Sequence, residues 1–133
     1  MKINVTKIIR PLDLGGKAPE LSGQIIQTWI NPTLAFMKER DEIFMEFARQ
    51  QKDMGKGDDP EIVQKWNDWI EGDFTNMNNR WFAKLWSQAD DVGTHWTFEE
   101  VDELKRVDPA LLEWMKSRSV EMIIEYRARE KKS

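Results

Sequence analysis

The stretch from Asp59 to Gln88 places the strongest constraint on the fold, because it holds four of the seven tryptophans of this 133-residue chain. These are Trp66, Trp69, Trp81 and Trp86. Any folded form must either bury such large side chains or present them to a partner. At Asp59-Pro60 the stretch opens with a good N-cap residue and a proline, which has no N–H to lose at the first helical position. The sequence therefore predicts a helix that begins at Pro60.

This predicted helix has one broad apolar face over its first half. At about 100° per residue, one arc collects Ile62, Val63, Trp66, Trp69, Ile70 and Met77. Such an arc is typical of an amphipathic helix packed on a core. Burial in a core is the simpler interpretation for Trp66 and Trp69.

The apolar arc rotates beyond Gly72. Trp81 stays near the first face, whereas Phe82 and Trp86 lie well round the helix. Either the helix breaks near Gly72, or its second half has two packing partners. Glycine is about 1 kcal/mol less favourable than alanine inside a helix, and asparagine is also a poor helix former. We therefore predict a break or kink between Gly72 and Asn76.

Length and composition predict a single domain over residues 1–133, since a chain of this size can bury a conventional core. The chain has no cysteine, which excludes disulfides, thiolate metal sites and cysteine nucleophiles. Its apolar runs are shorter than the roughly 20 residues that cross a bilayer. Its start lacks the long apolar segment of a secretory signal. We expect a soluble cytoplasmic protein without a membrane segment.

Charge is distributed unevenly along the chain. The net charge is −4, and acidic residues dominate the tryptophan-rich middle. Nucleic-acid sites need lysine and arginine to displace counterions from phosphates. The aromatic-rich segment has the opposite sign, so no nucleic-acid binding is expected.

The first 31 residues favour a β-hairpin. Ile3, Val5 and Ile9 alternate with other side chains, which predicts a strand over residues 2–10, and a second such run covers 24–30. The segment between these runs is rich in proline and glycine, which indicates a long loop. Two strands alone are marginal in water. The hairpin must therefore lean on helices or pair with another copy, and we predict a homo-oligomer that associates through Ile3, Val5 and Ile9.

The rest of the chain favours helices. Asn31-Pro32 repeats the cap-and-proline arrangement and predicts a helix to Lys52, antiparallel to the helix after Asp59. Thr97 and Glu100 fit a capping box that opens a helix over 98–106, and Asp108-Pro109 opens the last helix. The predicted class is α+β and mostly helical. A long-looped hairpin in 1–31 is followed by four or five helices in 32–133, in one bundle-like domain.

Catalytic and metal-binding motifs find little support. His95 follows Asp90 and Asp91, but a metal site needs three or four converging ligands, so a surface loop with incidental charges is favoured. The adjacent carboxylates Glu99 and Glu100 are more simply a solvated helix face than an acid–base pair. The glycines lack the strand–loop–helix context of a phosphate loop. We predict no catalytic, cofactor-binding or metal-ligating residues, and no enzyme activity.

The aromatic and methionine content favours a partner surface. Seven tryptophans, six phenylalanines and seven methionines are a large pool for one domain. Tryptophan is enriched at interface hot spots, and methionine at adaptable binding surfaces. Trp81, Phe82 and Trp86 lie where the arc turns away from the main stripe, so we predict that they contact a partner.

Three segments carry a family resemblance: Lys2-Ile-Asn-Val-Thr-Lys, Leu21-Ser-Gly-Gln-Ile-Ile-Gln-Thr-Trp-Ile-Asn-Pro and Asp108-Pro-Ala-Leu-Leu-Glu-Trp. With the chain's size and its extended pair before helices, the sequence resembles the tail assembly chaperones of long-tailed bacteriophages. The resemblance implies a non-enzymatic protein of the host cytoplasm. Such a protein binds the tape measure protein or another tail protein, prevents its aggregation and assists assembly of the tail tube. It assigns no role to single residues.

The physical reading of the sequence agrees with this resemblance. A chaperone for a long helical protein needs exposed apolar surface that can hold a helix, and an acidic middle segment keeps such a surface soluble. The alternative is a structural or adaptor protein that is retained in a phage or other macromolecular assembly. The sequence does not separate the two.

Overall fold

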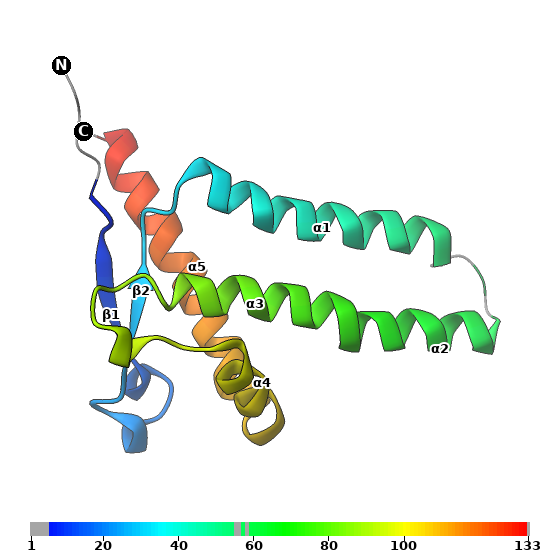
Figure 1. The fold of residues 1–133 in the computed structure, drawn as a ribbon, viewed down its shortest axis with the longest axis horizontal. Helices are drawn as coiled ribbons and strands as arrows, with labels where there is room; N and C mark the ends of the chain where they lie inside the picture. The colour runs from blue at the N-terminus through cyan, green and yellow to red at the C-terminus, as the bar shows by residue number, and fades with distance from the viewer. Residues whose placement is uncertain (1–5, 55–56, 58, 133) are drawn as a thin grey trace. The chain divides into compact units, whose positions relative to one another are not determined.

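The computed structural model describes residues 6–54, 57 and 59–132. A two-stranded antiparallel sheet precedes the helices, which confirms the mostly helical α+β class (Figure 1). The chain divides into two compact units. Unit 1 comprises Met1–Pro32 with Phe82–Ser133, and unit 2 comprises Thr33–Trp81. The single domain expected for 1–133 stays a prediction, because two compact units can unfold together or separately.

The sheet of unit 1 pairs β1 (Ile9–Asp13) with β2 (Ile25–Trp29), with Ile9 opposite Trp29. The second strand agrees with the predicted run over 24–30. The predicted first strand over 2–10 is wrong in its bounds, since β1 continues through Pro11. Proline lacks a ladder donor but is tolerated on an edge strand, and in a two-stranded sheet both strands are edges.

The loop between the strands is closed by one side chain. It contains two 3₁₀ turns, Leu14–Gly16 and Pro19–Leu21. The carboxylate of Asp13 accepts hydrogen bonds from the backbone N–H of Gly15 (2.8 Å) and of Gly23 (3.1 Å). Gly23 has a φ of 89°, a value that glycine adopts without strain. One carboxylate therefore ties both ends of the loop together.

The hairpin pairing continues past the strands through Asn31. Its Oδ1 accepts from the backbone N–H of Ile8 (2.6 Å), and its Nδ2 donates to the backbone oxygen of Thr6 (3.0 Å). The predicted role of Asn31 as a helix cap is therefore wrong. The following helix is capped by Thr33, whose Oγ1 accepts from the N–H of Phe36 (3.2 Å).

The core of unit 1 combines the sheet with three helical segments. These are the end of α3 (Thr75–Leu85), α4 (Phe98–Val107) and α5 (Pro109–Lys132). Its buried apolar side chains include Leu12, Leu14, Ile26, Trp29, Ile30, Phe82, Leu85, Trp86, Val101, Leu111, Leu112, Met115 and Ile123. The predicted hairpin therefore packs within the same unit as these helices.

The predicted helix starts at Asp59 and Thr97 are confirmed. Asp59 accepts from the N–H of Glu61 (3.0 Å) and caps α2 (Pro60–Trp69). Thr97 and Glu100 form a complete capping box at the start of α4. Both devices satisfy N–H groups that the first helical turn leaves without a partner.

Unit 2 is an antiparallel helical hairpin. Its first arm is α1 (Leu34–Met54), and its second arm contains α2, a π-helical turn (Ile70–Phe74) and most of α3. Phe36 near the start of α1 stacks on Trp81 at the end of the second arm, with ring centroids 4.6 Å apart. Further along α1, the ring centroid of Phe47 lies 5.2 Å from that of Trp66 on α2. This order confirms the predicted antiparallel pair, which Figure 1 shows side by side.

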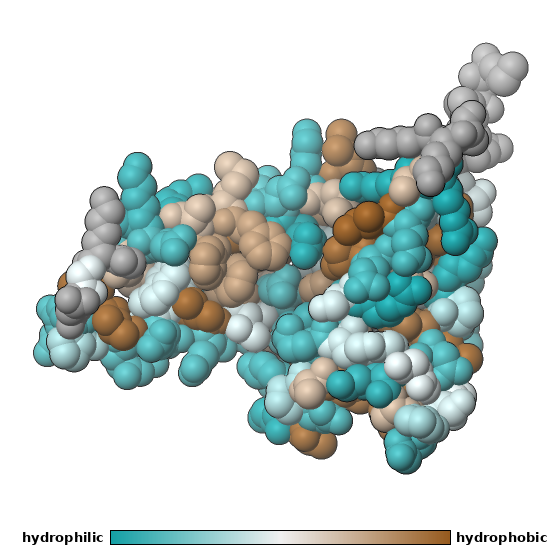
Figure 2. Space-filling model, turned by 180° about the vertical axis from the view of Figure 1, so that it is seen from behind, coloured by the Kyte–Doolittle hydropathy of each residue, from teal (hydrophilic) through white to brown (hydrophobic). Residues whose placement is uncertain are grey.

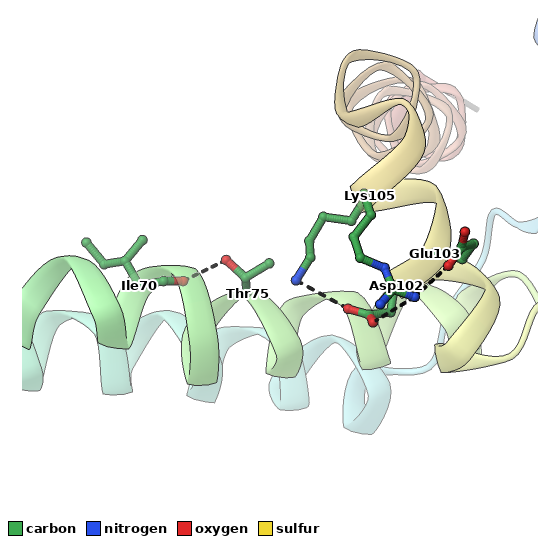
Figure 3. Close-up of polar contacts among 6 residues, drawn as sticks. Ile70, Thr75, Asp102, Glu103 and Lys105 are labelled. Atoms are coloured by element: carbon green, nitrogen blue, oxygen red, sulfur yellow. Dashed lines mark hydrogen bonds and ion pairs between the residues drawn. The ribbon is translucent and has the colours of Figure 1, made fainter.

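The π-helical turn replaces the predicted break. The helix continues from Pro60 to Leu85, and the hydroxyl of Thr75 donates to the backbone oxygen of Ile70 (2.6 Å; Figure 3). A π turn accommodates an extra residue and so rotates the side chains that follow it. The predicted break between Gly72 and Asn76 is therefore wrong, whereas a kink there stays a prediction. The alternative of two packing partners describes the second half of the helix.

Candidate protein-binding surface

The structure buries the three side chains that the sequence analysis assigned to a partner. Trp81 is 2% exposed, Phe82 2% and Trp86 0%. Trp81 belongs to unit 2, whereas Phe82 and Trp86 belong to the core of unit 1. The prediction that these residues form an exposed surface is wrong, because Trp81 stacks on Phe36 within unit 2 and the rotated arc of Phe82 and Trp86 enters the core of unit 1. Partner binding by them stays a prediction that requires them to leave these cores.

Trp86 is held by specific contacts on several sides. Its indole Nε1 donates to Ser119 Oγ on α5 (3.0 Å). Its ring centroid lies 5.3 Å from that of Phe82 and 6.1 Å from that of Trp96, the latter edge to face. Such aromatic pairs add to the stability gained from burial. Trp86 is therefore a central core residue of unit 1.

The predicted self-association residues are only partly placed. Ile3 and Val5 lie outside the described residues, and Ile9 is half-buried in β1. Within the described chain each strand has one sheet neighbour, so its other edge lies outside the two-stranded ladder. Association through the hairpin stays a prediction.

Of the residues considered for catalysis or metal binding, Asp91 accepts from the N–H of Gly93, Glu100 belongs to the capping box, and His95 contacts the backbone. His95 Nε2 lies 2.6 Å from the backbone oxygen of Ala89. The next carboxylates along α4 form ion pairs on the same helix: Asp102 with Lys105 (3.3 Å), and Glu103 with Arg106 (2.5 Å; Figure 3). Within residues 6–54, 57 and 59–132, no three histidine or carboxylate side chains are grouped to hold a metal ion.

Unit 2 leaves partly exposed a group of aromatic rings that includes Trp66 and Trp69, for which the sequence favoured burial in a core. Among its described residues only Phe36, Asn79 and Trp81 are buried. Two helices cannot cover a broad apolar face on both sides. The rings that remain partly exposed form what we call the aromatic cluster: Phe44, Phe47, Trp66, Trp69 and Phe74.

The aromatic cluster joins the two arms of the helical hairpin. The ring centroids of Phe47 and Phe74 are 4.9 Å apart. Those of the stacked pair Trp66 and Trp69 are 5.6 Å apart. Phe44 meets Phe74 edge to face at 5.8 Å, yet 41% of Phe44 is exposed. Figure 2 shows tan and brown side chains gathered over part of one face, bordered by teal hydrophilic ones. The cluster both holds the arms together and offers apolar surface.

A groove of about 650 Å³ runs between α1 and the second arm of unit 2. Its apolar lining consists of Ile43 from α1, Trp69 from α2 and Met77 from α3, all half-buried. Trp69 thus belongs to both the aromatic cluster and the groove. The groove is large enough to hold several side chains of a partner.

The rim of the groove is acidic. Glu39, Glu42 and Glu46 line it from α1, and Asp73 lines it from the π-helical turn. Arg80 supplies one guanidinium against these four carboxylates. The groove therefore combines an apolar floor with a surplus of negative charge.

The three α1 carboxylates could have been found from their spacing in the sequence. Glu39, Glu42 and Glu46 repeat at three and four residues, which places them on one helix face. Their opposition to Asp73 on the second arm depends on the tertiary fold.

A second and smaller pocket of about 220 Å³ lies in unit 1 and has a basic lining that includes Arg10, Arg118 and Arg129. Arg118 already donates to Glu121 (3.0 Å) and Glu125 (2.9 Å). These hydrogen bonds raise the pKa of Arg118. Because this guanidinium already binds two carboxylates, the pocket is a weaker candidate for a partner site than the groove.

Comparisons of the chain with protein-family models, curated proteins and solved structures gave no match. Among the described residues, no helix has both the length and the apolar character needed to cross a membrane.

Proposed function

We propose that this protein is a non-enzymatic tail assembly chaperone of the kind found in long-tailed bacteriophages. It binds the tape measure protein in the host cytoplasm, keeps it from aggregating and assists assembly of the tail tube. The family assignment rests on the sequence resemblance described above. The observation that carries the binding role is the partly exposed aromatic cluster of unit 2.

The aromatic cluster suits a chaperone because it remains accessible in the folded protein. A client that is long, helical and prone to aggregate has apolar helix faces that need temporary cover. Aromatic side chains offer large contact areas at low cost in conformational entropy. The cluster can therefore bind such a face without prior unfolding of the chaperone.

Charge supports the same proposal. The chain carries a net charge of −4, and carboxylates border the groove beside the cluster. Net charge opposes association between copies of the same protein. An acidic protein with exposed aromatic rings can therefore resist aggregation until a client binds.

Co-expression with the tape measure protein, followed by pull-down, tests this proposal. Phe44→Ser removes an exposed ring of the cluster and should reduce capture about tenfold, as at an interface hot spot. The matched control is Ile124→Ser, since Ile124 is 59% exposed on α5 of unit 1. This control should leave capture unchanged. Failure of the unmodified protein to capture the tape measure protein would refute the proposal.

The alternative, a structural or adaptor protein, differs from a chaperone in whether it is present in the finished particle. A chaperone leaves the assembly, whereas an adaptor remains in the product. We expect mass spectrometry of purified particles to detect the tape measure protein without this chain. Stoichiometric amounts of the chain in the particles would identify an adaptor.

A further inference from the structure

The groove of unit 2 has the chemistry of a site for a basic helix. We propose that it binds one amphipathic helical segment whose apolar side lies on Ile43, Trp69 and Met77 and whose lysines or arginines meet the carboxylate rim. This inference deepens the proposed function, on which it rests for the identity of the client. It adds the chemical class of the segment that the client must supply.

The length of the groove fits a short helix. On α1 the lining extends from Glu39 to Gln50, which at 1.5 Å per residue covers about 16 Å. A partner helix of about three turns has this length. Two antiparallel helices also leave a groove into which a third helix can pack, as in helical bundles.

Charge complementarity decides which helix fits. Three carboxylates lie along the α1 side of the groove, and Asp73 lies on the opposite side. A basic amphipathic helix can place cations toward both sides while its apolar stripe covers the floor. An acidic helix would be repelled at the same positions, and so would the phosphates of a nucleic acid.

One carboxylate of the rim already has a cationic partner and an amide hydrogen-bond donor from its own helix. Glu46 pairs with Arg49, and its Oε1 accepts from Gln50 Nε2 (3.0 Å). Glu42 and Asp73 are exposed, and they stand on opposite sides of the groove. These two residues are therefore the most direct probes of the site.

The test uses the full chain and a capped synthetic peptide of about 14 residues, with leucine and lysine at helical spacing. A second peptide replaces every lysine with glutamate. Isothermal titration calorimetry should show binding of the lysine peptide only, weaker at high salt because of screening. In Glu42→Lys/Asp73→Lys the dissociation constant should rise about tenfold or more, as expected when rim attraction becomes repulsion.

The matched control is Asp41→Lys/Glu71→Lys. Both residues are exposed on the same helical arms and are not part of the groove lining; Asp41 directly precedes Glu42, and Glu71 lies two residues before Asp73. The control makes the same change in net charge and should leave the dissociation constant within about twofold. Circular dichroism checks that both variants fold. Equal loss in the two variants, or equal binding of the glutamate peptide, would overturn the assignment.

Two further outcomes separate this inference from the proposed function. If Glu42→Lys/Asp73→Lys captures the tape measure protein as well as the unmodified chain does, the groove assignment is refuted and the chaperone proposal stands. If the lysine peptide binds as expected but the tape measure protein is never captured, the groove assignment stands and the chaperone proposal is refuted. A dimer that forms through the groove, seen by sedimentation and abolished in the same variant, would make a second copy the occupant and overturn the inference.

Discussion

Replacing Trp86 by alanine should destabilise the protein strongly. Trp86 is fully buried, and truncation of a buried large aromatic side chain costs about 3–5 kcal/mol. The change also removes two aromatic contacts and leaves the hydroxyl of Ser119 without its indole donor. A loss near the upper end, about 5 kcal/mol, is expected. Domains of this size are stable by only about 5–15 kcal/mol.

Urea denaturation followed by circular dichroism measures this change in the free energy of unfolding. Trp86→Phe keeps a buried ring but removes the indole donor, so it should cost less, about 1–3 kcal/mol. Ser119→Ala leaves the indole N–H without its acceptor (3.0 Å in the unmodified chain) and should cost a similar amount. In the double variant the two losses should be less than additive, since they remove the same hydrogen bond.

The contrary result would restore the sequence-based hypothesis for Trp86. If Trp86→Ala lost less than about 1 kcal/mol of stability and also bound the tape measure protein more weakly, Trp86 would be an exposed anchor rather than a core residue. An additive result for Trp86→Phe and Ser119→Ala would separately refute the direct hydrogen bond.

Three other predictions follow from single positions. Gly15→Ala should destabilise, because an added Cβ would lie 2.8 Å from the Cα of Ser22, whereas Gly72→Ala meets no atom within 4 Å and should raise stability by about 0.5–1 kcal/mol; thermal melts compare the two. Asn79→Leu should raise the melting temperature, because both polar side-chain atoms of Asn79 are buried without a hydrogen-bond partner among the described residues. Val5→Pro should weaken a homo-oligomer that pairs through the hairpin, and sedimentation that finds a monomer for the unmodified chain would reject that oligomer.

Local sequence was sufficient where a side chain acts within a few residues of itself. Asp59 and Thr97 cap helices through N–H groups two or three positions away. Asn31 has the same local pattern before Pro32, but its amide bonds to Ile8, 23 residues earlier. A cap and a tertiary clamp look alike in sequence, because the competing partner is fixed only by the hairpin register. The first strand, predicted over 2–10 but observed over Ile9–Asp13, was misplaced for the same reason: its position depends on the register with the second strand.

The candidate surface was harder to predict, because a helical wheel defines a face without identifying what covers it. The apolar arc containing Trp69 matched that of a core helix, yet Trp69 is only half-buried, in an arm that packs against one other helix of its unit. Trp86 deviated from that arc and was assigned to a surface, although it lies in a separate core. The rim of the groove likewise required Glu42 and Asp73, from distant segments, to be brought to one place.

The π-helical turn between Trp69 and Trp81 makes the packing of the later residues depend on how many residues the turn contains. Deleting one residue from Ile70–Phe74 would let the segment close into regular α-helix and would rotate every later side chain by about 100° relative to α2. The ring of Trp81 would then no longer face Phe36, and their stacked contact would be lost. The side chain of Phe82 would be rotated by the same amount. Exchanges of residue type at Gly72 are tolerable by comparison. Diverging homologues should therefore vary the composition of this turn while keeping its number of residues.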